Sequence, residues 1–465
     1  MSFWPFFKSL IKKLLDKAPW LECFYWEYVK FRIRSGRLVE KNMFRRLITI
    51  TDYSENEKGL VSKRCLGLFL NYVLINVPYY RDLSQKGFID SLDIKTFPVI
   101  TKADFRENFK DFISLEYTLP NLLERSTGGS TGEPFKFYSD AEAGFRDNAH
   151  HWYLYSLMGH VKADVIASCG GFVIPKKKRN NNIYWITRYH GHVFGDVAFS
   201  ALYLNDGNVK YYVDKLLKIK PDILRGYPSF FDSLANYIIT FNVELDFKVK
   251  GINLTAEMCT DSQRKRIERA FNSIVYFEYG HTEISIYCYT KGDNYDYYSS
   301  PVYGYVEVLD DTGRDVQAGD AGRVVVTGFN NKGMPFVRYD TGDIAELKYR
   351  SEGYVVFNKL YGRNQDFLWT EKNQKVYLTA LVFGQHVKAF GNIDKWQLYQ
   401  DTPGVVLFKI VKGQTYSIED EKEIIDSFCN VANFELIFNY VDFIEKTRAG
   451  KHLFLVQRCK IENFQ

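Results

Sequence analysis

The sequence lacks the cysteine patterns that cross-link secreted domains or bind metals. Its seven cysteines are odd in number and scattered, and no two of them form a Cys-x-x-Cys pair. This argues against a disulfide framework and a thiolate metal site, and it favours a reducing compartment. The longest apolar run, residues 65–77, is interrupted by two asparagines and is too short to cross a bilayer. Lysines interrupt the only early apolar stretch, so no secretory signal is recognised and we expect a cytoplasmic protein.

Internal repeats, low-complexity tracts and a strong overall charge are also missing. With 46% hydrophobic and 25% charged residues, the composition is that of a globular protein. The 465 residues suggest about three folding units. The first 50 residues hold eleven Lys and Arg against four Asp and Glu, so their net charge is +7 and that of the remainder is −2. Because the basic excess is confined to the N-terminus, a nucleic-acid partner for the whole chain is poorly supported.

The N-terminal segment predicts a basic amphipathic helix. Apolar residues recur at helical spacing between Phe6 and Leu15, and lysines fill much of the remainder. A basic helix that carries Trp and Phe can lie in the interface of an anionic membrane. The alternative, which we favour, is a helix packed on the protein's own core with its lysines in water. Peripheral contact of residues 1–50 with the inner face of a membrane stays open.

The remaining chain divides into segments of different character. From about residue 101, helical stretches alternate with short β-rich runs at 164–168 and 274–277, which predicts an α/β sheet with crossover connections. Residues 261–271 predict a helix with Asp261 as its N-cap. Short strands separated by glycine turns predict an antiparallel β module at 301–357. We therefore expect a helical region at 1–100, a core at 101–361 and a small α+β domain at 362–465.

A glycine- and hydroxyl-rich segment, R-S-T-G-G-S-T-G-E-P, covers residues 125–134. Such residues can bring backbone N–H groups and hydroxyls close around an anion. No Gly-Lys-Ser/Thr follows, so this is not a Walker A loop, and a kinase-like phosphoryl transferase is not supported. A flexible linker is the alternative, but the flanking segments are well patterned and the run ends in a rigid Pro134. The candidate anion-binding residues are Ser126, Thr127, Gly128, Gly129, Ser130, Thr131 and Gly132.

Four further polar segments follow in order. Residues 278–283, E-Y-G-H-T-E, follow an apolar run and could present Thr282 to a phosphate and Glu283 to Mg²⁺. Residues 338–343, R-Y-D-T-G-D, predict a polar turn between strands, for which a plain hairpin turn is the alternative. Residues 362–366, G-R-N-Q-D, stand at the junction with the C-terminal domain. Residues 447–451, T-R-A-G-K, display Lys451, which taken alone is an ordinary surface lysine.

In this order, the five segments resemble the motifs of the adenylate-forming superfamily of acyl-CoA synthetases and nonribosomal-peptide adenylation domains. The similarity is nearest to the phenylacetate–coenzyme A ligase branch and its CapK-like relatives in capsular polysaccharide biosynthesis. It covers roughly residues 101–456, with further support at 224–235 and 254–271. Glu133 departs from the pattern, because many members place lysine there. The resemblance implies a large α/β N-terminal domain and a small, mobile α+β C-terminal domain, an ANL-type fold.

The same resemblance implies a ligase that works in two steps. A carboxylate attacks the α-phosphate of MgATP to give an acyl-adenylate and pyrophosphate, and a thiol or an amine then takes the acyl group. ATP and Mg²⁺ are the implied cofactors, with coenzyme A as one candidate acceptor. An amide ligase of surface (capsular or O-antigen) polysaccharide biosynthesis is slightly favoured over a catabolic aryl- or acyl-CoA ligase. A non-catalytic adenylate-binding scaffold is the alternative of another class.

The resemblance also assigns roles to single residues. Thr282 would contact the α-phosphate, Glu283 would hold Mg²⁺, and Lys451 would bridge the attacking carboxylate and the α-phosphate. Asp343 would accept both ribose hydroxyls. The other implied contacts are with adenine (Ala256, Glu257, Tyr279 and Gly280) and with ribose or phosphate (Arg363).

The acid itself is not predicted. Its pocket should lie near residues 227–231, Cys259 and the strand that ends at Tyr279. Aromatic lining suits a flat or apolar acid, whereas tyrosine hydroxyls also suit a polar one. His150 and His151 could line the same cleft, but we expect them to be structural.

Overall fold

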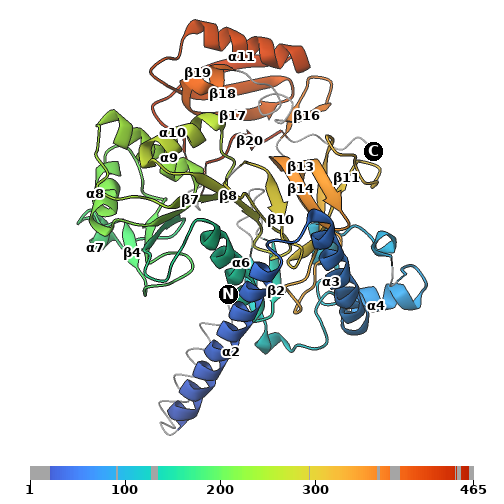
Figure 1. Ribbon diagram of the computed structural model, residues 1–465. Coiled ribbons are helices and arrows are strands. Elements are labelled where there is room, and N and C mark those ends of the chain that lie inside the picture. Colours follow the sequence, from blue (N-terminus) through green and yellow to red (C-terminus); the bar gives the residue numbers. More distant parts are fainter. Residues whose placement is uncertain are drawn as a thin grey trace.

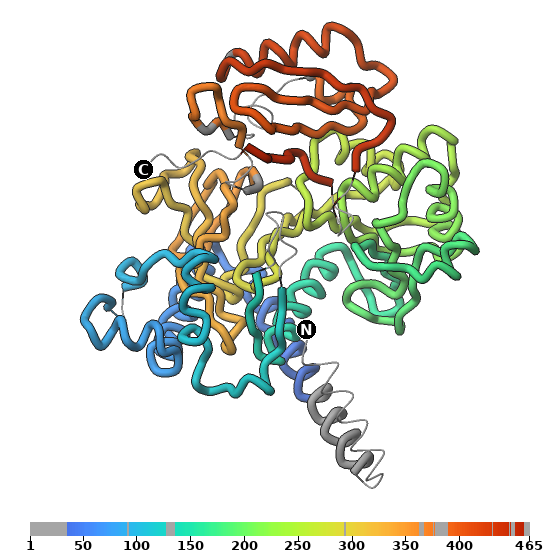
Figure 2. The backbone as a smooth tube through the Cα atoms, turned by 180° about the vertical axis from the view of Figure 1, so that it is seen from behind, coloured from blue at the N-terminus to red at the C-terminus, as the bar shows by residue number. Residues whose placement is uncertain are grey.

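The computed structural model describes residues 21–90, 93–126, 135–292, 294–363, 367–377, 388–445, 447 and 452–459 (Figure 1; Figure 2). Several predicted features lie outside these residues: the helix within residues 1–20, the loop residues 127–134, residues 364–366 of the junction motif, and residues 448–451 with Lys451.

One large mixed sheet organises the core of the described chain. Its twelve strands run in the order β11-β12-β13-β14-β10-β9-β8-β7-β6-β3-β5-β4. The strands β3, β5, β6, β7 and β8 are parallel, and their neighbours on both sides are antiparallel. The strands of the parallel side are β3 (Ile166–Gly170), β4 (Trp185–Thr187), β5 (Val197–Ser200), β6 (Ile223–Gly226), β7 (Gly251–Thr255) and β8 (Val275–Gly280). Those of the antiparallel side are β9 (Tyr287–Tyr289), β10 (Tyr297–Ser299), β11 (Gly304–Leu309), β12 (Ala321–Gly328), β13 (Tyr339–Ser351) and β14 (Tyr354–Arg363).

Helices cover both faces of the parallel half. On one face, alternate strand residues such as Leu224, Leu254 and Phe277 pack against α8 (Val209–Ile219), α9 (Pro228–Thr240) and α10 (Asp261–Phe271). The opposite face, with Ile223 and Tyr276, packs against α6 (Ala143–Leu157). This burial of both faces is the reason that the strands of this half are apolar. The expected α/β architecture is confirmed.

Helices from the N-terminal region pack on the antiparallel half. They are α3 (Glu55–Asn76), α4 (Pro78–Gln85) and α5 (Lys102–Glu107), with short 3₁₀ turns η1 (Ile94–Thr96) and η2 (Leu119–Asn121). Ser54 caps α3 and shares a capping box with Glu57. Helix α2 (Leu21–Thr49) packs on α6 through its C-terminal part, where Leu47 is buried in one cluster with Tyr153 and Leu154 (Figure 1). Among the described helices, none alone has the length and apolar character of a membrane span, although α3 and α4, bent by 90°, satisfy these criteria as a pair.

Along the chain, a two-stranded hairpin connects the N-terminal region to α6. Its strands are β1 (Leu123–Ser126) and β2 (Lys136–Ser139), with Ser126 opposite Lys136. The glycine-rich segment connects them. A four-residue helix, α7 (Lys176–Arg179), follows β3 and carries the basic K-K-K-R run.

The C-terminal domain has a separate sheet and core (Figure 2). Its sheet runs β19-β18-β17-β20, and α11 covers it with Ile424 and Phe428 buried. The elements are β15 (Phe367–Trp369), β16 (Lys375–Tyr377), η4 (Lys388–Asn392), β17 (Ile393–Thr402), β18 (Val405–Lys412), α11 (Ile418–Val431), β19 (Glu435–Tyr440) and β20 (Leu455–Gln457). The predicted small α+β domain is therefore present, although its boundary at residue 362 stays a prediction.

Two local predictions were wrong. Thr260, not Asp261, is the N-cap of α10: its side chain accepts the Gln263 N–H while the Gln263 side chain accepts the Thr260 N–H. Asp261 is the first helical residue instead. The segment expected to be a turn at 338–343 is mostly strand, because Asp343 pairs with Arg363 in the ladder between β13 and β14.

Candidate functional site

The candidate site lies where three parallel strands end. Strands β6, β7 and β8 end at Gly226, Thr255 and Gly280, and parallel strands deliver their carboxyl ends to one edge of a sheet. This edge is the usual ligand-binding edge of an open α/β sheet. Three of the predicted contact residues, Ala256, Gly280 and Thr282, are exposed there.

Two residues on these loops, and one before β13, have a strained backbone. Ala256 has a φ of 67°, Ile284 of 55° and Arg338 of 46°, all in the left-handed region that residues other than glycine rarely adopt. Ala256 follows β7, Ile284 follows Glu283, and Arg338 precedes β13. Strain of this kind is retained where the surrounding structure enforces it, most often at functional sites.

The predicted adenine and ribose residues contact each other directly. The Tyr279 hydroxyl donates to Asp343 Oδ2 at 2.8 Å, joining β8 to β13 across 64 residues of sequence. His281 Nε2 lies 3.0 Å from the same hydroxyl and 3.2 Å from the same carboxylate oxygen. Burial, reinforced by the Asp343 charge, raises the pKa of Tyr279 well above its usual value, so this phenol stays protonated and remains a donor.

Glu283 is a buried carboxylate with two neighbours. Its side chain is 6% exposed, and Oε1 accepts a hydrogen bond from the Tyr339 hydroxyl at 3.0 Å. The Lys102 ammonium, on α5, lies 3.8 Å from the same oxygen. Thr282 precedes Glu283 on the exposed side of the turn. Sequence reasoning missed Lys102 and Tyr339, although Tyr339 stands within the R-Y-D-T-G-D motif.

The donor set fits a magnesium ion that is shared with a phosphate ligand. Mg²⁺ prefers oxygen and is usually held by one or two carboxylates together with substrate phosphates and water. Glu283 supplies one such carboxylate, and the described residues include no group of three or more His, Cys, Asp or Glu that would form an all-protein metal site.

A buried charge network supports the end of β8. The Glu278 carboxylate bonds Arg225 Nη2 at 3.0 Å, His151 Nδ1 at 3.1 Å and Asn253 Nδ2 at 2.8 Å. Burial alone would raise the pKa of Glu278, but Arg225 and His151 outweigh it and hold that pKa well below its usual range. Burial alone would lower the pKa of His151, but Glu278 and Asp147 raise it to about 9. The network therefore holds ionised groups beneath the site.

His150 has different surroundings. Its Nδ1 lies 2.8 Å from the Arg146 carbonyl and its Nε2 3.0 Å from Ser300 Oγ. Burial lowers its pKa to about 4, so the ring is neutral at physiological pH. Both histidines are buried and bonded to protein groups, which is the pattern expected of structural histidines.

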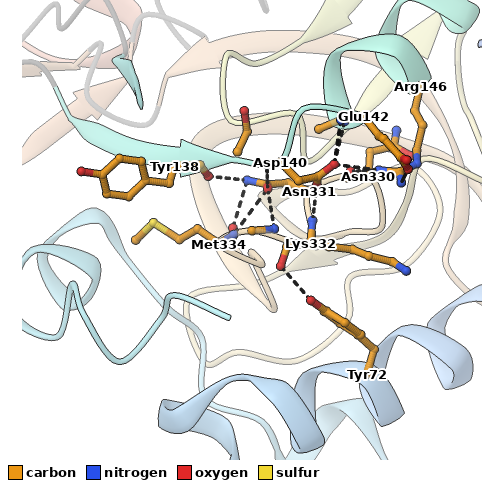
Figure 3. A network of polar contacts seen from close by, with 12 residues as sticks. Tyr72, Tyr138, Asp140, Glu142, Arg146, Asn330, Asn331, Lys332 and Met334 are labelled. Atoms are coloured by element: carbon orange, nitrogen blue, oxygen red, sulfur yellow. Dashed lines mark hydrogen bonds and ion pairs between the residues drawn. The ribbon is translucent and has the colours of Figure 1, made fainter. Parts of the chain in front are cut away.

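The hairpin that carries the glycine-rich segment is fixed at its base (Figure 3). Asp140, directly after β2, accepts the backbone N–H groups of Ala143 through Oδ1 and Lys332 through Oδ2. Asn331 accepts the Asp140 N–H and donates to the Tyr138 carbonyl. We call this set the Asp140–Asn331 clasp. It ties the hairpin to the start of α6 and to the loop after β12.

The C-terminal domain meets the core at Glu257. This carboxylate accepts the Ser229 N–H and hydroxyl, each at 3.1 Å, and the His452 N–H at 2.8 Å. The predicted adenine-pocket residue therefore lies at the domain boundary. Arg266, on α10, makes a two-pronged ion pair with buried Asp232 at 2.7 and 3.0 Å and lies 3.8 Å from Asp394 of the C-terminal domain.

A cavity of about 720 Å³ opens between the domains. Its lining mixes cations and aromatic rings from both sides, including Arg179, Tyr184, Tyr203, Lys395, Phe443 and Thr447.

The structure brings several of the predicted site residues together around the ends of β7 and β8. They are Ala256, Glu257, Tyr279, Gly280, Thr282, Glu283 and Asp343. Arg363 is placed by its backbone opposite Asp343. Ser126 is the exposed last residue of β1.

Comparisons with known proteins found sequences similar to this chain. Residues 368–458 match the family model described as the CapK C-terminal domain. The chain is 27% identical over 415 residues to protein CapK of Staphylococcus aureus, covering 84% of this chain and 87% of that protein. It is 23% identical over 321 residues to a phenylacetate-coenzyme A ligase of Thermus thermophilus, covering 64% and 68%.

Solved structures establish the fold. The crystal structure of 2-hydroxyisobutyryl-CoA ligase in its postadenylation state, in complex with 2-HIB-AMP, superposes with a TM-score of 0.65 at 17% identity, covering 85% of this chain and 88% of that one. The same ligase in its thioesterification state gives 0.55. The resemblance to adenylate-forming ligases and the ANL-type fold are confirmed, and the similarity to phenylacetate-coenzyme A ligases supports a ligase enzyme.

Proposed function

We propose that this protein is an ATP-dependent ligase that adenylates a carboxylic acid and then transfers the acyl group to a thiol or an amine. The observation that carries the proposal is the meeting of the Tyr279–Asp343 pair with buried Glu283 at the carboxyl edge of the parallel strands. A nucleoside site beside a metal-binding carboxylate is the arrangement that a reaction on MgATP needs.

Electrostatics accounts for the proposed roles. A carboxylate and a triphosphate repel each other, so their charge must be neutralised as they approach. Mg²⁺ held by Glu283 would supply Lewis acidity at the phosphates. Thr282 and the hydroxyls and N–H groups of residues 126–132 would bind phosphate oxygens, and Lys451 would lie between the two reacting anions.

The remaining proposed roles concern the nucleoside. The exposed Ala256 and Gly280 would contact adenine together with the Tyr279 ring, and Asp343 would accept the ribose hydroxyls. Arg363, opposite Asp343 in the ladder, would add a ribose or phosphate contact.

The proposed setting is the biosynthesis of surface polysaccharide, which the similarity to protein CapK supports. In that setting the acceptor would be an amine. The second candidate is a catabolic CoA ligase, favoured by the similarity to phenylacetate-coenzyme A ligases. The structural neighbour has also been crystallised with 2-HIB-AMP and CoA. We place the enzyme in the cytoplasm, with peripheral membrane contact through residues 1–50 as a further proposal.

The membrane proposal has a direct test. A deletion of residues 1–20 ends before α2 and leaves the described core contacts of that helix, such as those of Leu47, in place. The full chain should sediment with vesicles that contain phosphatidylglycerol, and the chain without residues 1–20 should not. Equal sedimentation of both forms, or none by either, would remove the proposal.

Pyrophosphate release tests the reaction. The protein, MgATP and a panel of aromatic, aliphatic and sugar acids are incubated first without an acceptor and then with CoA or amino sugars. Release that depends on one acid identifies the substrate, and the acceptor that accelerates turnover separates thioester from amide formation. Binding of ATP without release by any acid in the panel would leave two explanations, a substrate outside the panel such as a lipid-linked uronate and the scaffold alternative.

A further inference from the structure

His281 lies between the two halves of the proposed nucleotide site. It is the fourth residue of E-Y-G-H-T-E, directly after β8. On one side its Nε2 reaches both the Tyr279 hydroxyl and Asp343 Oδ2. On the other side its Nδ1 lies 3.3 Å from Ser285 Oγ. One ring thus connects the nucleoside residues to the turn that carries Thr282 and Glu283.

The backbone of His281 closes that turn. Its carbonyl accepts the Ile284 N–H at 3.1 Å, and Ile284 adopts the left-handed conformation. This turn, which carries Thr282 and Glu283, is closed by a backbone hydrogen bond that a substitution of the His281 side chain leaves in place.

Hydrogen-bond chemistry fixes the proton on this ring. An ionised carboxylate only accepts hydrogen bonds, so the contact with Asp343 requires a proton on Nε2. In the tautomer that carries its proton on Nε2 alone, Nδ1 accepts from the Ser285 hydroxyl. The side chains of His281 and Asp343 are 12% and 15% exposed, so water screens their contact only weakly.

We propose that His281 is a positioning residue, which holds the Asp343 carboxylate and the Tyr279 ring in the orientation that receives the nucleoside. This inference rests on the proposed function, because it takes the ligand to be an adenine nucleotide. The imidazole acts through Asp343 and Tyr279 rather than on the reacting atoms. Its effect must therefore appear in nucleotide affinity, and mainly in the part of that affinity that depends on the ribose hydroxyls.

The test measures AMP binding by calorimetry, with 2′,3′-dideoxy-AMP as the second ligand. The wild-type protein should bind AMP more tightly than the dideoxy compound. His281→Leu should weaken AMP binding about tenfold, the value of one charge-assisted hydrogen bond. It should change dideoxy-AMP binding by less than about twofold, because that ligand makes no use of the oriented carboxylate.

A conservative variant separates positioning from folding. The amide nitrogen of His281→Gln lies about as far from the backbone as Nε2 and keeps a donor towards Asp343, so this variant should retain AMP affinity within about threefold. His190→Leu, at an exposed histidine in another loop, is the matched control and should bind both ligands like the wild type.

Each outcome has one meaning. Equal losses for both ligands in His281→Leu, or no loss for either, would overturn the positioning role while leaving the proposed function standing. Failure of His281→Gln to restore binding to a folded protein would also overturn it. Failure of the wild type to bind AMP or MgATP would overturn the proposed function and this inference with it.

Discussion

The backbone N–H of His452 donates to Glu257 Oε1 at 2.8 Å and joins two domains across 195 residues of sequence. Lys451 is the residue next to this contact. Glu257 itself lies directly after the strained Ala256 at the carboxyl edge of the sheet. The C-terminal domain therefore contacts the core beside the candidate site.

Replacement of Lys451 should separate the two half-reactions. We expect Lys451→Met to reduce acid-dependent pyrophosphate release by about a hundredfold or more, because a cation between two anions is lost. Transfer from a synthetic acyl-adenylate to the acceptor should be nearly unchanged. Lys422→Met, at an exposed lysine of α11, is the matched control. Normal pyrophosphate release by Lys451→Met would remove this residue from the reaction.

Glu283→Gln tests the proposed metal ligand. The amide keeps an oxygen for the Tyr339 hydroxyl, so the fold should persist, but it binds Mg²⁺ poorly. Pyrophosphate release should fall about a hundredfold, and the Mg²⁺ concentration at half-maximal rate should rise. AMP binding without metal should change little. Glu142→Gln is the control, because the half-exposed Glu142 carboxylate forms an ion pair with Arg146 away from the proposed metal site. A Mg²⁺ dependence like that of the wild type would contradict the assignment.

The ion pairs of Arg266 predict two different effects. Arg266→Met leaves the buried Asp232 carboxylate without its two-pronged partner, and we expect a loss of about 3 kcal/mol in the free energy of unfolding. Asp394→Asn removes only the longer contact at the domain boundary, so its effect on unfolding should stay below about 1 kcal/mol.

Urea unfolding of both variants measures this difference. Asp394→Asn should also be cleaved faster between the domains in limited proteolysis. Equal destabilisation by the two substitutions would show that Arg266 acts mainly through the domain boundary rather than within the core.

His151 predicts a pH dependence of stability. Its pKa is raised to about 9 in the folded protein, so its contribution is complete below the unfolded value of about 6.5 and is lost as the pH rises through about 9. The advantage of the wild type over His151→Gln in urea should therefore shrink between about pH 6 and pH 9.5. A constant difference over this range would show that the ring is not charged beside Glu278 and Asp147.

Much of the fold was predictable from local pattern. Apolar runs ending in polar segments predicted β3 and β8, and glycine turns predicted the antiparallel strands. The sequence did not predict that β9 and β10 join both halves into one sheet. These strands have only three residues each, and Cys288 and its neighbours are buried without the alternation that marks a half-exposed strand.

The candidate site was predictable only in part, because some of its contacts join residues that are far apart in the sequence. Tyr279, Glu283 and Asp343 stand in compact motifs that a resemblance can identify. Lys102 stands in an unremarkable helix far from Glu283 in sequence, and only folding brings the two side chains together. At position 260 the error was one of capping chemistry, because both Thr260 and Asp261 are good caps and the choice depends on the reciprocal bond with Gln263.

The continuity of the large sheet bears on how such an enzyme could change its acid substrate. The loop after β6, which carries Tyr227, and the start of β13, which carries Asp343, belong to one hydrogen-bonded lattice with β7, β8, β9, β10 and β14 between them. Side-chain bonds shorten this path, because Ser229, at the start of α9 just after β6, donates to Glu257 and Tyr279 on β8 donates to Asp343. A change of acid preference that alters the loop after β6 should therefore also alter nucleotide affinity, so the two specificities would evolve together.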